Sequence, residues 1–326
     1  MQRRPFCPWC WSALFRHLTA SLVLALLLPA AGCDRQPEPV RVDPGKQSSA
    51  VVPARQLQQQ DMVVRLGIGS MITPKEGYVY YRRLADYLEK KLESPVRIID
   101  RGTYREFNDL LAGGGLDLAF VCGGPYVEGK ADFDLQLLVV PETPDGETVY
   151  YAYLIVPASS PARSLDDLRG RRFAFTDPQS NTGRLVPTYM LSRHGETPEE
   201  FFGELIYTYA HDKSIQAVAA GKVDGAAVDS LIFDYLVAIN PEIAGQVRIL
   251  ERSQPYGIPP VVVRPGLPEP LRERLRELLL DMHNDPEGKT ILAGMMIERF
   301  VTGDDADYDG IRDIEEFIRG RQMKID

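Results

Sequence analysis

The chain has 326 residues, of which 44% are hydrophobic and 25% charged, values typical of a globular protein long enough for two domains. Its formal net charge of −9 argues against nucleic acid as a partner, and an anionic ligand would have to be held by local dipoles rather than by bulk positive charge. The four histidines are far apart in the sequence, so we predict neither a metal site nor a cofactor.

Residues 1–33 are typical of a bacterial export signal. A basic stretch precedes an apolar run from Leu18 to Leu28, which is short for a transmembrane helix and is followed by small residues. The segment Ala30-Ala-Gly-Cys33 resembles the bacterial lipobox, and this resemblance implies that Cys33 is lipidated and becomes the first mature residue. Ordinary signal cleavage with an unmodified Cys33 is the alternative.

Residues 34–61 are rich in proline and glutamine and have no apolar periodicity, so we expect a flexible tether. If Cys33 is lipidated, Cys122 is the one thiol left in the mature chain, and no internal disulfide is expected. The sequence therefore predicts an exported protein that is held by its lipid at the periplasmic face of the cell membrane.

From residue 62 onwards, strand and helix patterns alternate, which predicts an α/β protein with largely parallel sheets covered by helices. The first expected elements are a strand (Val63–Ile68), a helix (Tyr81–Leu92), a strand (Val96–Ile99), a helix that carries Phe107 and Leu111, and a strand at 116–121.

The segments 104–121 and 211–228 have the same pattern at a constant offset of 107 positions (211 − 104). In each segment, a helix ends at a glycine. The glycine is followed by an apolar residue, an aspartate (Asp117 or Asp224) and an apolar strand. Two similar units about a hundred residues apart predict two similar lobes. We expect both aspartates to cap turns.

Between these units, the strand pattern Arg172–Thr176 leads into a polar loop and then into a helix that ends near Ser192. Short hydroxyls and free backbone N–H groups at a helix start form a cradle for an anion and need no lysine or arginine. The alternative is that Ser180 or Thr182 merely caps the helix. The residues of the expected cradle are Ser180, Asn181, Thr182 and Gly183.

Tyr104 and His211 occupy matching positions, each after a strand and at the start of a helix. Ligands of open α/β sheets bind beyond the carboxyl ends of the strands, so we expect both side chains to face one cleft. Tyr150 and Tyr151 should alternate across a strand, so one of them faces the cleft. Asp229 follows the strand of the second unit. Beside an oxyanion its carboxylate is unfavourable unless the ligand or His211 carries a proton, and in the first case it would recognise a hydrogen-phosphate donor.

The run Asp177-Pro-Gln-Ser-Asn-Thr-Gly-Arg-Leu-Val-Pro187 resembles the D-P-x-S-x-S-G-x-x-x-P motif of the PhnD-like phosphate-, phosphite- and phosphonate-binding proteins of ABC importers, with Thr182 in place of a serine. The resemblance extends from residue 62 to about residue 285. It implies a type II periplasmic-binding-protein fold in which the Ser/Thr cluster and a following histidine grip the phosphonate oxygens. Tyr104 and Tyr150 would line the cleft.

On this resemblance, lobe one comprises residues 62–152 and 256–326, and lobe two comprises residues 156–252. Each lobe would be a mixed, mostly parallel sheet flanked by helices. Two crossing segments near Tyr153–Pro157 and Arg252–Pro259 would form the hinge. Because only the closed state lets both lobes contact the ligand, binding would favour closure.

Relatives that bind aminoalkylphosphonates hold the amine with two carboxylates, and the matching positions here are Leu231 and Pro259. The sequence therefore favours phosphate, phosphite or a small phosphonate whose tail carries no amine. The resemblance also implies that an ABC permease and ATPase are the partners, and we expect a monomer.

Two other classes of function remain open at the level of the sequence. A phosphoester or phosphonate hydrolase would use Ser180 or His211 as a catalytic residue, but no base and orienting group are placed beside the serine, so no catalytic residue is assigned. A ligand-sensing ectodomain would reuse the same two lobes.

Overall fold

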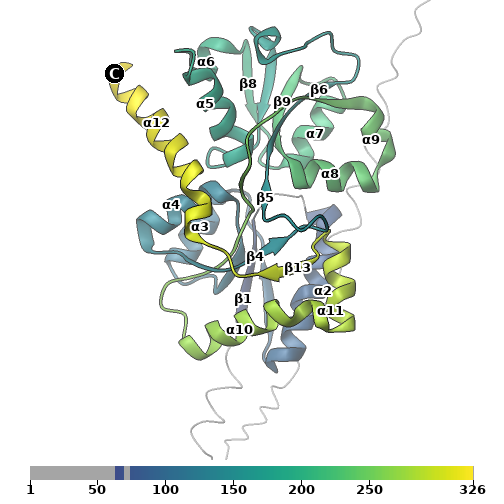
Figure 1. The fold of residues 1–326 in the computed structure, drawn as a ribbon, viewed down its shortest axis with the longest axis vertical. Coiled ribbons are helices and arrows are strands. Elements are labelled where there is room, and N and C mark those ends of the chain that lie inside the picture. The colour runs from purple at the N-terminus through teal and green to yellow at the C-terminus, as the bar shows by residue number, and fades with distance from the viewer. Residues whose placement is uncertain (1–62, 70–73, 326) are drawn as a thin grey trace, which may run out of the picture. The chain divides into compact units, whose positions relative to one another are not determined.

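The computed structural model describes residues 63–69 and 74–325 (Figure 1). The predicted signal sequence at 1–33, the lipidation of Cys33 and the tether at 34–61 lie outside the described residues.

Lobe one is built on a six-stranded sheet with the strand order β13-β4-β12-β3-β1-β2. Strands β2, β1 and β3 are parallel, whereas β12 is antiparallel to both of its neighbours and β13 is antiparallel to β4. The strands are β1 (Val64–Ile68), β2 (Val96–Ile99), β3 (Leu118–Phe120), β4 (Gln136–Glu142), β12 (Val261–Val263) and β13 (Arg299–Val301).

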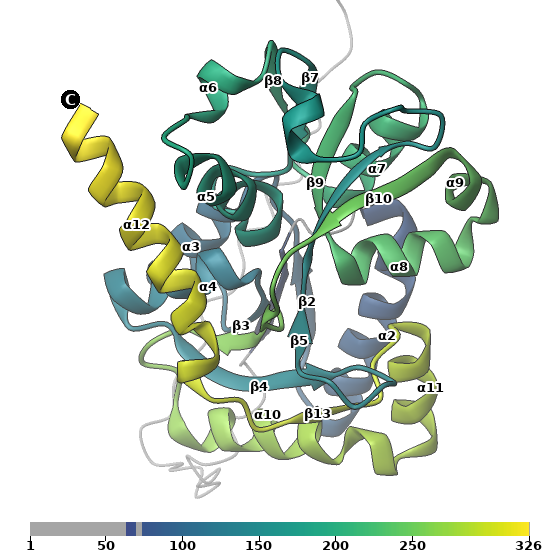
Figure 2. The same cartoon turned by 45° about the horizontal axis from the view of Figure 1, so that its top comes forward.

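Helices cover both faces of this sheet (Figure 2). Successive side chains of a strand point to opposite faces, so Leu118 and Phe120 pack toward α2, α10 and α11, while Ala119 packs toward α3, α4 and α12. The helical segments are α2 (Pro74–Leu92), α3 (Tyr104–Ala112), α4 (Gly123–Phe133), α10 (Glu269–Asp281), η3 (Met282–Asn284), α11 (Pro286–Gly294), η4 (Asp305–Tyr308) and α12 (Asp309–Ile325).

Lobe two repeats the plan with a five-stranded sheet of order β10-β6-β9-β7-β8. Strands β8, β7 and β9 are parallel to one another, and β6 is antiparallel to both of its neighbours, β9 and β10. Its strands are β6 (Ala152–Pro157), β7 (Arg172–Phe175), β8 (Glu204–Tyr207), β9 (Gly225–Asp229) and β10 (Val247–Arg252). Its helical segments are η1 (Leu165–Leu168), η2 (Asn181–Leu185), α5 (Val186–Ser192), α6 (Pro198–Phe201), α7 (His211–Ala219), α8 (Ser230–Ile239) and α9 (Pro241–Gln246).

The two lobes confirm the internal repeat. Helices α3 and α7 begin and end at residues that are 107 positions apart (211 − 104 and 219 − 112). The repeat also includes an ion pair between neighbouring strands: Arg65 Nε lies 2.8 Å from Asp117 Oδ2, and Arg172 Nε lies 3.2 Å from Asp224 Oδ2. The two aspartates therefore pair with arginines, which corrects the expectation that they only cap turns.

A short ribbon joins the lobes, in which β5 (Val149–Tyr150) pairs with β11 (Tyr256–Gly257) in antiparallel fashion. The segment Tyr153–Pro157, expected in a crossing, lies within β6 inside the second sheet. The first crossing between the lobes therefore lies a few residues earlier in the chain than predicted, before Ala152.

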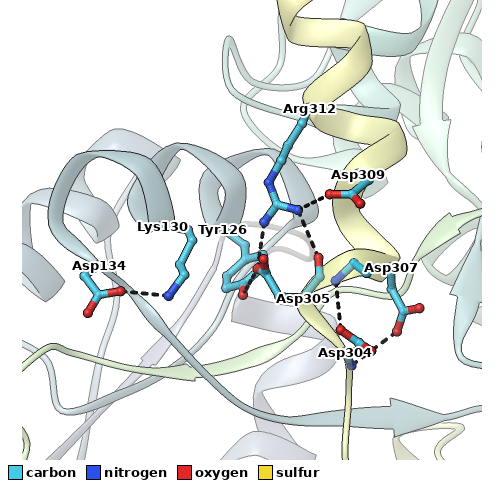
Figure 3. Close-up of polar contacts among 9 residues, drawn as sticks. Tyr126, Lys130, Asp134, Asp304, Asp305, Asp307, Asp309 and Arg312 are labelled. Carbon is cyan, nitrogen blue, oxygen red and sulfur yellow. Dashed lines mark hydrogen bonds and ion pairs between the residues drawn. The ribbon is translucent and has the colours of Figure 1, made fainter.

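Helix α12 starts against α4 of lobe one and runs to α5 of lobe two (Figure 1). A polar cluster fixes its start (Figure 3): the Tyr126 hydroxyl donates to Asp305 Oδ1 at 2.6 Å, and Arg312 donates to the same oxygen at 2.7 Å and to Asp309 at 2.6 Å. The two lobes thus share a helix as well as the ribbon. Among the described helices, none is long and apolar enough to cross a bilayer.

Candidate functional site

The polar segments that follow the strands of both lobes meet between the lobes. They bring together all eight side chains and backbone positions that the sequence singles out, and every one is buried. We call this cluster the interlobe site; its residues are Tyr104, Tyr150, Ser180, Asn181, Thr182, Gly183, His211 and Asp229.

The start of η2 has the form of an anion cradle. Ser180 is the N-cap residue, since its Oγ accepts the Gly183 N–H at 3.0 Å. The capping alternative is therefore correct for Ser180, although its hydroxyl hydrogen is still able to donate. Thr182 does not cap, and its buried Oγ1 has no hydrogen-bond partner among the described residues. The turn from Asn181 to Leu185 is a π-helical turn, a form that often occurs at functional sites.

Position 183 of this cradle must be a glycine, because the side chains of Thr176 and Ser180 lie close against its Cα atom. A Cβ atom there would lie 1.6 Å from Thr176 Oγ1 and 3.0 Å from Ser180 Oγ, so no larger residue fits. Thr176, at the carboxyl end of β7, is itself buried, and its Oγ1 lacks a partner within the described chain. The sequence analysis missed Thr176, although its place directly after a strand was the available signal.

Tyr150 links the cradle to lobe one. Its hydroxyl accepts a hydrogen bond from Asn181 Nδ2 at 3.0 Å and lies 3.6 Å from the Cys122 Sγ. Cys122 follows β3 and caps α4, and it is a free, fully buried thiol whose pKa is raised by burial. The sequence predicts a structural role for Cys122 in a loop of the cleft, and its thiol lies beside the Tyr150 hydroxyl of the cluster.

His211 is held in one tautomer. Its Nδ1 accepts the backbone N–H of Asp229 at 3.0 Å, and burial lowers its pKa to about 3. A neutral imidazole that accepts at Nδ1 carries its proton on Nε2. This Nε2–H is buried and has no acceptor in the described part of the protein, so it is available to donate to a ligand.

Asp229 is the acidic member of the cluster. Its Oδ1 accepts the backbone N–H groups of Leu231 at 2.8 Å and Ile232 at 3.3 Å, and so caps α8. Burial outweighs these two hydrogen bonds and raises the pKa of Asp229 to about 7. The second oxygen, Oδ2, is buried without a described partner.

Tyr104 comes from lobe one. The N-cap residue Thr103 and Glu106 form a capping box that starts α3 at this tyrosine. The Tyr104 backbone N–H donates across the cleft to Asp177 Oδ2 at 3.2 Å, and its hydroxyl is buried without an aligned partner among the described residues. Burial is the main cause that raises the pKa of this hydroxyl, and the nearby Cys122 and Asp177 raise it further. Tyr104 is therefore a neutral donor.

The cluster as a whole can hold a compact polar anion. Burying a polar atom without a hydrogen bond costs on the order of 1–3 kcal/mol, so several such atoms in one place indicate a polar guest. The guest would meet four neutral donors from side chains, those of Tyr104, Thr176, Thr182 and His211. The unpartnered atoms are Tyr104 Oη, Thr176 Oγ1, Asn181 Oδ1, Thr182 Oγ1, His211 Nε2 and Asp229 Oδ2. Within the described residues, no group of His, Cys, Asp or Glu side chains is arranged to hold a metal ion.

A cavity, which we call the side pocket, adjoins the interlobe site at Asp229 and has a volume of about 360 Å³. Leu231 and Pro259 are among its walls. Val149, Tyr151 and Tyr153 line it and Tyr150 does not, so the two neighbouring tyrosines face opposite sides, as the predicted alternation requires. Tyr151 faces the side pocket, whereas the Tyr150 hydroxyl faces Asn181 of the cradle.

Comparison with known sequences gives consistent matches. Residues 66–308 match the family described as "ABC transporter, phosphonate, periplasmic substrate-binding protein". The phosphonates-binding periplasmic protein of Escherichia coli (strain K12) is 23% identical over 271 residues, which cover 82% of this chain and 80% of that protein. The phosphate-import protein PhnD of Mycolicibacterium smegmatis is 24% identical over 274 residues, which cover 75% of this chain and 82% of that protein.

Solved structures show the same fold. A binding protein component of an ABC phosphonate transporter from Pseudomonas aeruginosa has a TM-score of 0.76 at 22% identity, with 81% of this chain and 89% of that chain covered. PhnD1 from Prochlorococcus marinus, in complex with methylphosphonate, has a TM-score of 0.72 at 19% identity, with 79% and 98% covered. The two-lobed α/β fold is thereby confirmed.

Proposed function

Because this chain belongs to the family of periplasmic substrate-binding proteins of ABC phosphonate transporters, we propose that its interlobe site binds a tetrahedral phosphorus oxyanion: phosphate, phosphite or a small phosphonate. Proteins of this family are extracytoplasmic binding components and not enzymes, and their partners are the permease and ATPase of the importer.

The convergence of neutral donors carries this proposal. Thr182 and His211 from lobe two and Tyr104 from lobe one each present a buried hydrogen-bond donor to the same site. Each hydrogen bond to a charged guest contributes about 1.5–3 kcal/mol, and the start of η2 adds backbone N–H groups and the positive end of a helix dipole. An acidic chain can bind an anion in this way without a single lysine or arginine in the site.

Asp229 defines which anions fit. A bare carboxylate oxygen beside an oxyanion is repulsive unless one proton lies between them. With a pKa of about 7, Asp229 either shares a proton of its own or accepts one from a P–O–H group of the ligand. We therefore assign to Asp229 the selection of phosphorus anions that carry a proton near neutral pH, and the rejection of sulfate, which carries none.

Closure of the lobes belongs to the same proposal. The Tyr104 N–H to Asp177 bond and the approach of Gly124 to the Gln179 carbonyl join lobe one to lobe two beside the site. A ligand that contacts both lobes stabilises this closed arrangement, and the closed form is the state that the permease would recognise. The domain limits of 62–152 with 256–326 and of 156–252 also belong to this proposal, except that β6 lies in the second sheet, so lobe two begins at Ala152.

We propose methylphosphonate as the first probe. Leu231 and Pro259 stand where amine-binding carboxylates are expected in relatives that bind aminoalkylphosphonates, and one structural neighbour is in complex with methylphosphonate. A thermal-shift screen of the purified protein against phosphate, phosphite, methylphosphonate, 2-aminoethylphosphonate and sulfate tests the function. A rise in Tm with phosphorus oxyanions and none with sulfate supports it, and no rise with any of them refutes it.

Two substitutions test the site itself. Ser180→Ala and His211→Ala should each weaken binding by about 1–3 kcal/mol, because each removes a group that faces the anion. Affinities unchanged in both variants would remove this site assignment.

Membrane attachment is a separate proposal, based on the Ala30-Ala-Gly-Cys33 segment. We propose that Cys33 is lipidated and that the protein acts as a monomer tethered to the membrane. Mass spectrometry of the protein extracted from membranes should show a diacyl or triacyl modification on Cys33, which Cys33→Ser abolishes. Sedimentation of the detergent-solubilised protein should give the mass of one chain.

A further inference from the structure

The side pocket is larger than a small inorganic anion requires. It has a volume of about 360 Å³ and adjoins the interlobe site at Asp229. An apolar cavity of about 150 Å³ is enough for benzene, so the side pocket has room for an organic group well beyond a methyl. Its volume also lies in the range of pockets that hold organic ligands.

Apolar side chains form part of the lining of the side pocket. Leu231 lies two residues after Asp229, with the lining residue Ser230 between them, and Ile258 and Pro259 line the pocket from the returning crossing segment. Phe120, at the end of β3, is a further apolar lining residue. A substituent that enters the pocket from the phosphorus would therefore have carbon surface to pack against.

Aromatic side chains that are fixed by their neighbours add to these walls. The ring of Tyr81 packs edge-on against Phe120, with centroids 5.2 Å apart. Tyr151 is covered by the Arg252 guanidinium, which lies 3.4 Å from the ring centroid. Rings held in this way lose little entropy when they contact a ligand, so they form a preorganised surface for an apolar or aromatic group.

Carboxylates surround the outer part of the pocket. Asp145, Glu147 and Asp234 are exposed lining residues, and Arg252 is the single cation among the described lining residues. Arg252 is already engaged with the Tyr151 ring, and its charge also acts on Asp234. An anionic tail would meet like charges at this mouth, which costs binding free energy.

We propose that the side pocket is a subsite for a carbon substituent on the bound phosphorus group, and that the substituent it prefers is an apolar or aromatic group that carries no negative charge. This inference rests on the proposed function, since the interlobe site must first hold the phosphonate. It extends that function from small anions to phosphonates and phosphate monoesters with an alkyl or aryl tail.

The test is a calorimetric comparison of methylphosphonate, phenylphosphonate and phosphonoacetate with the purified protein at one pH. Burial of a phenyl group predicts that phenylphosphonate binds at least about tenfold more tightly than methylphosphonate. Phosphonoacetate, with its anionic tail, should bind more weakly than methylphosphonate. Phenylphosphonate that binds no better than methylphosphonate overturns the subsite.

A variant pair assigns the effect to the pocket. Leu231→Ala removes one wall and should lower the preference for phenylphosphonate over methylphosphonate about tenfold, because a phenyl group covers more of that wall than a methyl group does. Ile239→Ala is the matched control, because Ile239 is an exposed apolar residue of the same helix outside the pocket, and the preference should not change.

The outcomes separate this inference from the proposed function. If methylphosphonate binds but the phenyl group adds nothing, the subsite is refuted and the function stands. Binding of 2-aminoethylphosphonate that is tighter than that of phenylphosphonate also overturns the assignment, because it makes the acidic mouth a cation site. If neither phosphate, phosphite nor any phosphonate binds, the proposed function itself fails.

Discussion

The backbone N–H of Asp229 donates to His211 Nδ1 at 3.0 Å and so links two residues 18 positions apart. Asp229 ends β9 and His211 begins α7, so the hydrogen bond joins the strand to the helix that precedes it. This bond keeps the imidazole proton on Nε2, where it serves as a donor. A side chain whose pKa is lowered by burial and one whose pKa is raised by burial are thus parts of one unit.

This pair makes a prediction about stability and pH. The pKa of His211 falls to about 3 in the folded protein, below its usual value of about 6.5, and that of Asp229 rises to about 7, above its usual value of about 4. Between about pH 4 and pH 6.5 the unfolded chain binds an extra proton at His211, so the free energy of unfolding rises with pH. In the same interval the folded protein binds an extra proton at Asp229, so the free energy of unfolding falls with pH.

The two slopes therefore oppose each other in the wild-type protein. Asp229→Asn removes the second slope and leaves that of His211, which adds about 1.4 kcal/mol per pH unit to the dependence of unfolding free energy on pH. Urea denaturation of both proteins at pH 4.5, 5.5 and 6.5 measures the difference. A variant with the same slope as wild type across this interval would contradict the assigned protonation states.

The Thr182 hydroxyl should contribute to binding and not to folding. Thr182→Val keeps the shape of the side chain but removes Oγ1, and we expect binding to weaken by about 1–3 kcal/mol. The unfolding free energy should be unchanged or higher, because Oγ1 has no partner among the described residues. The control is Thr188→Val: the Thr188 hydroxyl donates to the Arg184 carbonyl at 2.7 Å in the following helix, outside the site. Calorimetry measures the affinity and urea denaturation the unfolding free energy of the two variants. An unchanged Kd for Thr182→Val would exclude Thr182 from the site.

A single methyl group should hinder closure. A Cβ atom on Gly124 of lobe one would lie 2.1 Å from the carbonyl oxygen of Gln179 in lobe two, so Gly124→Ala cannot reach the closed arrangement without displacing backbone. Since the clash is between lobes, we expect affinity to fall by tenfold or more, about 1.4 kcal/mol, with an unfolding free energy close to that of wild type.

Gly245→Ala is the control for this variant, because nothing lies within 4 Å of the added Cβ in α9. Small-angle scattering with saturating methylphosphonate should show compaction for wild type and Gly245→Ala only. Equal compaction of Gly124→Ala would mean that the contact between Gly124 and Gln179 is not part of closure.

Much of the fold was accessible from the sequence, because the same local signals occur twice. The glycine-apolar-aspartate pattern after residues 104–112 and 211–219 located two helices and two strands at matching positions. The rule that ligands lie at the carboxyl ends of strands then predicted that Tyr104, His211 and Asp229 lie near one another, and all three are buried in the cluster between the lobes.

What could not be predicted depends on contacts between segments far apart in the sequence and on very short elements. Thr176 is an ordinary small residue after a strand, and only the fold of lobe two puts it beside Gly183 of the cradle, just as the fold of lobe one puts Cys122 beside Tyr150. Strand β5 has two residues, too few to show a period of two, so the position of the first crossing could not be read from alternation. The tautomer of His211 depends on a backbone N–H, which leaves no signal in the sequence.

The most direct test is a calorimetric titration of the purified protein at pH 7 with methylphosphonate and, separately, with sulfate. If neutral donors and Asp229 together hold a phosphorus oxyanion that shares one proton with the carboxylate, methylphosphonate should saturate one site per chain and sulfate should give no binding heat. Saturable binding of sulfate with an affinity equal to that of methylphosphonate, or no binding of either anion, would contradict this account.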